Sequence, residues 1–204
     1  MRLVLIGASG HGKVCAEIAE AQGLYDDIVF LDDNRELKKC GKYPVMGVSD
    51  DVVRYLTGDT EFFVSIGNSL FRSRIQNKIL IAGGRIARLV HPFSSVSESA
   101  FVGSGTVVMA GAVINADARV GEGGIVNTGS SIDHDCEIGD YCHVAVGAHV
   151  CGTVSIGSCT WIGAGVVISN NLSVCSDCMI GDGAVVVKDI NVPGTYVGVP
   201  AKRI

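Results

Sequence analysis

The sequence of 204 residues has no long hydrophobic run and no excess of positive charge, and both absences exclude classes of protein. A membrane-spanning helix needs about 20 consecutive apolar residues, and no stretch approaches that length. The apolar start, MRLVLI, ends at Gly7, which is too early for a secretory signal. Sixteen basic and 21 acidic residues leave a net charge of −5, which argues against nucleic acid or an anionic membrane as partner. We therefore expect a soluble, cytoplasmic protein without membrane insertion.

The eight cysteines lack the pattern of a disulfide framework or a metal site. Disulfides are typical of oxidising compartments, and we expect no secretory signal. Cys175 and Cys178 form a CxxC pair, but a zinc site usually needs a second pair or histidines at set spacing. Cys136 and Cys142 occupy a small-residue track of the repeat described next, where a thiol is a compact filler. We expect no metal and no permanently bound cofactor.

One aliphatic residue returns at every sixth position between residues 96 and 186. All sixteen are Val or Ile, namely Val96, Val102, Val108, Ile114, Val120, Val126, Ile132, Ile138, Val144, Val150, Ile156, Ile162, Ile168, Val174, Ile180 and Val186. This period fits neither a helix nor an ordinary strand. It is typical of a hexapeptide solenoid, in which each six residues supply a short strand and a corner, with the β-branched side chains pointing inward.

Two further features accompany the aliphatic residue. The position two places earlier is small in the first part of the repeat, from Ser94 to Ala148. Glycine follows the aliphatic residue in several hexads, for example at 103, 121 and 139. We expect the small residues to allow sharp turns and these glycines to relieve corners that need unusual backbone dihedrals.

The first ninety residues are typical of an α/β nucleotide-binding unit. Strands are expected at 2–6, 28–31, 62–66 and 86–90, and helices at 13–22 and 69–82. A glycine cluster, Gly7-Ala8-Ser9-Gly10-His11-Gly12, follows the first strand, as in folds that hold phosphate at a helix N-terminus. His91-Pro92 is the expected hinge, so the domains are 1–91 and 92–204.

Three clusters in this unit follow strands, at the sheet edge where open α/β folds bind ligands. They are the glycine cluster, Asp32-Asp33 and Gly67-Asn68. Taken alone, Asp32-Asp33 fits a nucleotide contact or a solvated turn equally well. The spacing G-x-x-G-x-G departs from the dinucleotide fingerprint, which disfavours an NAD oxidoreductase.

The polar segment Asp133-His134-Asp135-Cys136-Glu137 interrupts the aliphatic coil with an imidazole among carboxylates. Acyl transfer to an amine or hydroxyl needs a base near neutral pKa, which histidine supplies. If three hexads make one coil, residues eighteen apart stack, which would place His134 between Ala116 and Gly152. The Gly152 N–H would then lie near a developing oxyanion. Asn127, one hexad earlier, could orient His134 or the substrate, or belong to an asparagine ladder.

These motifs resemble the sugar O- and N-acetyltransferases among the hexapeptide-repeat acyltransferases. The segments GASGHGKVCAEIAE, FLDD, SIGN and VGVPAKRI carry the resemblance together with the repeat. The likeness is strongest to the bacillosamine-pathway type, which acts on a UDP-4-amino-4,6-dideoxy sugar. It implies a Rossmann-like domain that holds the nucleotide sugar, then a left-handed parallel β-helix. It also implies a homotrimer with acetyl-CoA, the co-substrate, between subunits.

The resemblance also implies roles for individual residues. His134 would be the general base, and Asp135 would raise its basicity, with Asp133 and Glu137 as alternative partners. The remaining contacts fall on three groups: Ser9, Gly10 and His11 for the diphosphate or sugar; Asp32, Asp33 and Gly67 for the uridine pocket; and His143, Gly152 and Ala164 for acetyl-CoA.

Other functions remain open from the sequence. An O-acetyltransferase acting on a sugar such as sialic acid shares the layout. A β-helical zinc hydratase would use an H-x4-H pair, whereas five residues separate His143 from His149. A non-catalytic nucleotide sensor would leave the His-acid segment without a purpose.

Overall fold

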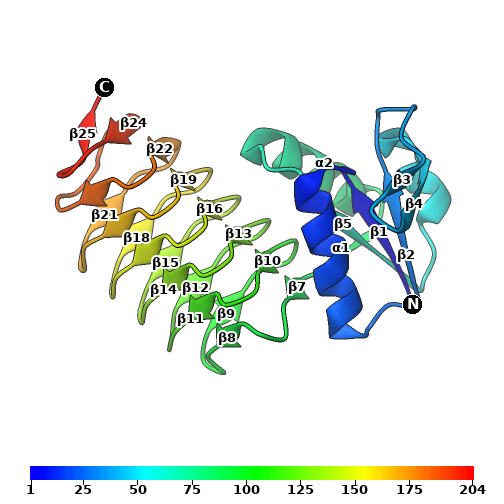
Figure 1. Cartoon of the computed structure of the whole chain (residues 1–204), viewed down its shortest axis with the longest axis horizontal. Helices are drawn as coiled ribbons and strands as arrows, with labels where there is room; N and C mark the ends of the chain where they lie inside the picture. The colour runs from blue at the N-terminus through cyan, green and yellow to red at the C-terminus, as the bar shows by residue number, and fades with distance from the viewer. The chain divides into compact units, whose positions relative to one another are not determined.

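The computed structural model describes residues 1–204, and the chain divides into two compact units, Met1–Pro92 and Phe93–Ile204 (Figure 1). The two α-helices have 13 residues each. Neither is long and apolar enough to cross a membrane.

The first unit is built on a six-stranded sheet with the order β3-β4-β2-β1-β5-β6. Its elements are β1 Arg2–Ile6, α1 Gly10–Gln22, β2 Asp27–Leu31, β3 Lys39–Cys40, β4 Tyr43–Gly47, the 3-10 helix η1 Ser49–Tyr55, β5 Thr60–Val64, α2 Ser69–Ile81 and β6 Arg85–Ile86. Every pair is parallel except β3 with β4. Because β2 and β5 lie on opposite sides of β1, the carboxyl ends of β1 and β5 flank the crevice where such sheets bind ligands.

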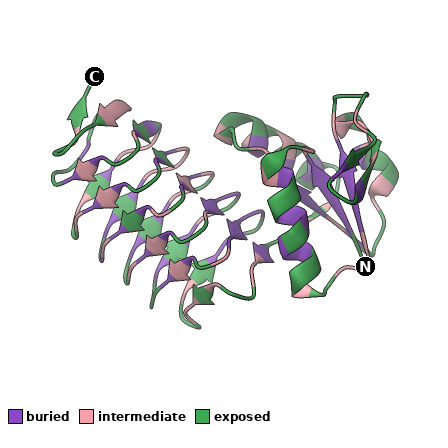
Figure 2. Ribbon diagram, viewed as in Figure 1, coloured by how far each residue is buried: buried purple, intermediate pink, exposed green.

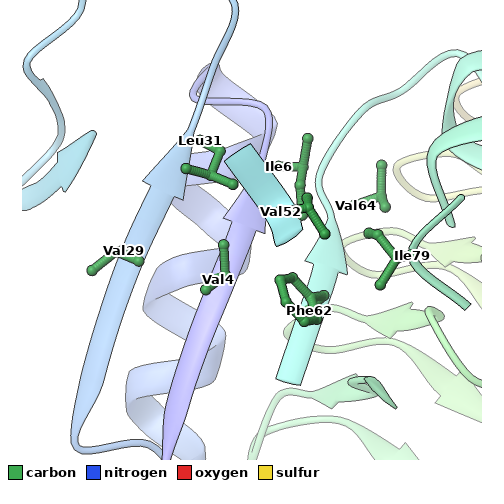
Figure 3. Packing of buried hydrophobic residues seen from close by; sticks show 8 residues of the cluster. All are labelled: Val4, Ile6, Val29, Leu31, Val52, Phe62, Val64 and Ile79. Atoms are coloured by element: carbon green, nitrogen blue, oxygen red, sulfur yellow. The ribbon is translucent and has the colours of Figure 1, made fainter. Parts of the chain in front are cut away.

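Both faces of this sheet are covered, which explains why its strands are apolar throughout. On one face, Val4 and Ile6 pack in a cluster with Val52 of η1 and Ile79 of α2 (Figure 3). Leu3 and Leu5, which alternate with Val4 and Ile6 along β1, are fully buried as well. The strands therefore carry no alternation of apolar and polar residues.

Several boundaries differ from the sequence prediction. Helix α1 begins at Gly10 and not at residue 13, because the Lys13 N–H already donates to the Ser9 carbonyl at 3.0 Å. β5 ends at Val64, and the hydroxyl of the following Ser65 donates to the carbonyls of Ile6 and Gly7. The strand predicted at 86–90 is divided into β6 and β7 (Leu89–Val90). β3, β4 and η1 were not predicted.

The second unit is a three-sided parallel β-helix of two- to four-residue strands. They are β8 Ser95–Val96, β9 Phe101–Val102, β10 Val107–Val108, β11 Val113–Ile114, β12 Arg119–Val120, β13 Ile125–Val126, β14 Ser131–Ile132, β15 Glu137–Ile138, β16 His143–Val144, β17 His149–Val150, β18 Ser155–Ile156, β19 Trp161–Ile162, β20 Val167–Ile168, β21 Ser173–Val174, β22 Cys178–Ile180, β23 Val185–Val186, β24 Gly194–Val197 and β25 Lys202–Arg203.

Three faces arise because each strand pairs with the one eighteen residues on. Face 1 includes β10-β13-β16-β19-β22, face 2 is β8-β11-β14-β17-β20-β23, and face 3 is β9-β12-β15-β18-β21. Face 1 continues into β24 and then into β25, which is antiparallel to β24. The predicted aliphatic stack is the core: fifteen of its sixteen members are buried, and only Val96 at the start is half-buried. Figure 2 shows this buried interior along the coil.

The corners of the coil correct the expected role of the glycines. The residue three places after each aliphatic residue has positive φ in fourteen successive hexads, from Gly105 to Gly183. The glycines directly after the aliphatic residue do not share this conformation. A Cβ on Gly103 would instead lie 2.6 Å from the backbone of Gly121. These glycines are required by the close approach of successive coils, and not by dihedral angles.

Buried polar side chains of the small-residue track link one coil to the next. The hydroxyl of Thr106 donates to the carbonyl of Gly121, fifteen residues on, at 2.7 Å. The thiols of Cys136 and Cys142 make the same step to Cys151 and Gly157, both at 3.1 Å. The cysteines occupy the track as predicted, and they also satisfy corner carbonyls.

Replacing Thr106 tests this linkage. Its hydroxyl also accepts the Gly124 N–H at 2.9 Å, so Thr106→Val leaves a donor and an acceptor unpaired in a buried place. We expect the free energy of unfolding to fall by about 1–3 kcal/mol, as measured by urea denaturation at fixed protein concentration. Thr106→Ser keeps the hydroxyl and should lose clearly less. Equal losses in both variants would contradict the hydrogen-bond explanation.

Candidate functional site

His134 and Asp135 form a tight pair at the corner that follows β14. The imidazole Nδ1 lies 2.7 Å from Asp135 Oδ2. Asp135 has φ of 58° and is one of the left-handed corner residues, a conformation that aspartate tolerates better than most residues. The corner is held from both sides, since Asp135 N–H donates to Ala116 O and Thr153 N–H donates to His134 O. The repeat therefore fixes the backbone that carries the pair.

The neighbouring carboxylates increase the basicity of His134. Hydrogen bonding to Asp135, with a smaller contribution from the charge of Asp133, raises the pKa of His134 above its ordinary 6.5. A proton on Nδ1 faces Asp135, which leaves the lone pair of Nε2 available.

Among the three candidate carboxylates, Asp135 is the partner of the ring. Asp133 accepts hydrogen bonds from Asn115 Nδ2 and from the His134 backbone N–H, both at 2.8 Å. Glu137 belongs to β15, where its carboxylate lies 3.9 Å from Arg119. Asp133 and Glu137, the alternative partners of His134, therefore have other contacts in the structure.

The free edge of the imidazole lies against Gly152, as the stacking of residues eighteen apart predicted. A Cβ on Gly152 would be 2.7 Å from Nε2 and Cε1 of His134. Only a residue without a side chain leaves room for the ring in this position.

Asn127, His143 and Trp161 form a second polar group on face 1. Asn127 Nδ2 donates to His143 Nε2 at 3.0 Å, and its Oδ1 accepts the Thr128 N–H. The His143 and Trp161 rings pack edge to face, with their centroids 4.2 Å apart. Asn127 therefore orients His143 and not His134, contrary to one of the roles expected for it. Ala164, at the corner after β19, belongs to this side of the coil.

The remaining coil histidine does not join either group. His149 is exposed on face 2, where its Nδ1 lies 2.8 Å from the Ser131 hydroxyl. No group of three or more His, Cys, Asp or Glu side chains in the chain is placed to hold a metal ion.

In the first unit, a hydrogen bond joins two of the three clusters at the carboxyl edge of the sheet, the glycine cluster and Asp32-Asp33. Asp32 Oδ2 accepts the Ala8 N–H at 2.7 Å, and its Oδ1 accepts the Asn34 N–H at 2.8 Å. Asp33 accepts the Ser49 N–H. Asp32 therefore fixes the glycine cluster beside the end of β2, and both of its oxygens are engaged in doing so.

The expected phosphate contacts lie on the open side of this edge. Ser9 and Gly10 are exposed, Gly67 is exposed, and His11 is partly buried. Ser9 is the N-cap of α1 but forms no side-chain cap, so helix amide groups are left for an anion. Burial and the charge of Arg72 lower the pKa of His11 to about 4. His11 is therefore neutral at physiological pH.

Arg72 was missed by sequence reasoning, although it supports this edge. Its side chain is 1% exposed, and its Nη1 donates to the carbonyls of Ile66 and Gly67, each at 2.8 Å. An arginine inside a helix that also carries Arg74 and Lys78 gives no sequence signal that distinguishes it from surface charges. Only the fold shows that it points inward.

Comparison with known proteins places the chain in a family. Residues 2–79 match the family model of the PglD N-terminal domain. The acetyltransferase domain of PglB from Neisseria gonorrhoeae is 40% identical, with a TM-score of 0.96 over 100% of this chain and 99% of that one. The chain belongs to the sugar N-acetyltransferase family. Like these proteins, it joins a Rossmann-like unit to a left-handed β-helix, and the predicted fold class is confirmed.

Two other family members extend the comparison. PerB from Caulobacter crescentus, solved with CoA and GDP-perosamine, is 32% identical with a TM-score of 0.94, covering 100% of this chain and 97% of that one. The UDP-N-acetylbacillosamine N-acetyltransferase of Bacillus subtilis is 33% identical over 110 residues, 53% of this chain and 51% of that protein. The chain thus matches about half the length of this curated relative.

Gly152→Ala tests the contact between Gly152 and His134. The new methyl group would displace the imidazole, and displacement of a catalytic group by about 1 Å can lower a rate by about 100-fold. We expect a loss of acetyl transfer of that order, with the melting temperature nearly unchanged. Gly58→Ala is the control, because no atom lies within 4 Å of a Cβ there. Full activity in Gly152→Ala would show that the ring position is unimportant.

Proposed function

We propose that this chain is an acetyl-CoA-dependent N-acetyltransferase that acetylates the amino group of a UDP-4-amino-4,6-dideoxy sugar. The observation that carries the proposal is the His134–Asp135 pair at 2.7 Å with its free nitrogen against Gly152. Relatives support the substrates: the Neisseria domain was also solved with acetyl coenzyme A, and the relatives named for a substrate act on amino sugars. An amine acceptor is therefore favoured over the hydroxyl acceptor of an O-acetyltransferase.

The reaction is a direct transfer with His134 as general base. The sugar amine attacks the thioester carbonyl while Nε2 of His134 takes its proton, forming the C–N bond. The tetrahedral oxyanion is stabilised by the Gly152 N–H, and then the C–S bond breaks and the CoA thiolate leaves. The thiolate receives the proton, which regenerates the neutral imidazole. Histidine variants of the Caulobacter enzyme, solved with CoA and GDP-perosamine, support a role for a histidine in this family.

The two ligands would use different parts of the chain. The diphosphate would contact Ser9, Gly10 and His11 at the start of α1, with Asp33 and Gly67 nearby. Acetyl-CoA would contact His143 and Ala164 of face 1 together with Gly152. Because His134 and Gly152 lie at the corner after face 2, a homotrimer that brings face 1 of one subunit to this corner of the next would complete the site.

Product analysis tests this function directly. The purified protein, acetyl-CoA and a UDP-4-amino-4,6-dideoxyhexose should yield a sugar heavier by one acetyl group in mass spectrometry. His134→Ala should lower turnover by about 10²- to 10⁴-fold and change acetyl-CoA affinity little. His149→Ala, an exposed histidine on face 2, should keep wild-type turnover. Acetylation of a hydroxyl sugar in place of the amine, or full activity in His134→Ala, would overturn the assignment.

Asp135→Asn tests the electrostatic part of the mechanism. Because the negative charge of Asp135 stabilises the imidazolium and raises the pKa of His134, removing it should lower that pKa. Activity needs the neutral ring, so the rising limb of the pH profile of kcat/KM should move to lower pH. The plateau should fall because the base is weaker. The substrate amine also titrates, but it is the same in the wild type and in Asp135→Asn, so it does not contribute to the difference between their pH profiles. An unchanged profile in Asp135→Asn would contradict the role of Asp135.

A further inference from the structure

A pocket of about 420 Å³ lies at the carboxyl ends of β2 and β4 in the first unit. One wall is the turn that follows Asp32, and the other is formed by the end of β4 and the start of η1. The lining combines apolar and charged side chains. The apolar ones are Leu37, Val45, Met46 and Val48, and the basic ones are Arg35, Lys38 and Arg54.

The acceptor groups of this pocket are already engaged by the protein. Both oxygens of Asp32 accept backbone N–H groups. Asp51 accepts the Val48 N–H at 3.0 Å and pairs with Arg54 at 3.2 Å. Asn34 Oδ1 accepts the Glu36 N–H. The carboxylates at the pocket therefore shape its walls and offer a ligand few free acceptors.

The donor groups are more available. Arg35 takes part in none of the ion pairs of the chain, and the Lys38 ammonium uses one donor on the Arg35 carbonyl. Arginine and lysine side chains carry donors only. A matching ligand thus has a flat apolar body for Leu37 and Met46 and an edge rich in hydrogen-bond acceptors.

We propose that this pocket receives the nucleobase and selects bases with a carbonyl oxygen at the position where cytosine and adenine carry an amino group, with Arg35 as a specificity-determining residue. The inference rests on the proposed function, in which the first unit binds a nucleotide sugar. Uracil, thymine and guanine present an acceptor oxygen where cytosine and adenine present an amino donor. With an amino base, N–H groups would face the N–H groups of Arg35, and both would remain unpaired.

Calorimetric titration of the full-length protein with UDP, dTDP, GDP, CDP and ADP tests this selection. UDP and CDP share the ribose and diphosphate and differ at the base edge. We expect CDP and ADP to bind about tenfold more weakly than the tightest of the other three, as expected when the bound base covers one hydrogen-bonding group and leaves it unpaired. Arg35→Met should reduce the difference between UDP and CDP to about threefold or less.

Lys39→Met is the matched control, because it removes one positive charge from β3 outside the pocket lining. It should keep the discrimination of the wild type. The proposal would be overturned if the wild type bound UDP and CDP equally well or bound no nucleotide. It would also be overturned if Arg35→Met lost the same affinity for all five nucleotides. Selective binding without acetyl transfer would contradict the proposed function alone, since the titrations contain no acetyl-CoA or amine.

Discussion

The coil depends on one backbone constraint, which is that the chain must turn through a left-handed conformation once in every six residues. This conformation is unfavourable for most L-residues, yet it is kept through fourteen successive hexads. Glycine occupies half of these corners, and Asp117, Asn171 and Asp177 are among the others. The conformation returns because each corner lies over the corner eighteen residues earlier, and the inward Val or Ile stays in register only if every turn is alike.

The proposed chemistry uses this constraint. Asp135 occupies a left-handed corner, so its short side chain lies beside the residue before it and reaches Nδ1 of His134. The next coil presents Gly152 to the other side of the ring. A catalytic pair on a free loop would lose conformational entropy each time it formed. Here the stacked corners hold the backbone on both sides, and the pair is arranged before substrate arrives.

The sequence was sufficient to predict the features that depend on a repeating pattern. It was insufficient to predict contacts between side chains that only the folded chain brings together. The period of six predicted the core, and together with the three hexads per coil that the resemblance implies it also predicted the stacking of His134 on Gly152. The role of the glycines was wrong, since close approach of backbones and positive φ both select glycine and only coordinates separate them. Orienting His134 was one of the roles expected for Asn127, but the corner after face 1 places it beside His143. Arg72 carries no pattern at all.

The filled interior of the coil places the proposed active site on its outer surface, in agreement with the proposed homotrimer. Val, Ile and small residues occupy the inside of every turn, so no ligand can enter there, and all polar groups used in the proposed chemistry project outward. The His134 side chain is 57% exposed, and water at such a surface screens the charges that develop in acyl transfer. Excluding that water requires a second surface over the corner. The chain's own polar group at Asn127, His143 and Trp161 lies on another side of the triangle, which is the arrangement expected if a neighbouring copy supplies it.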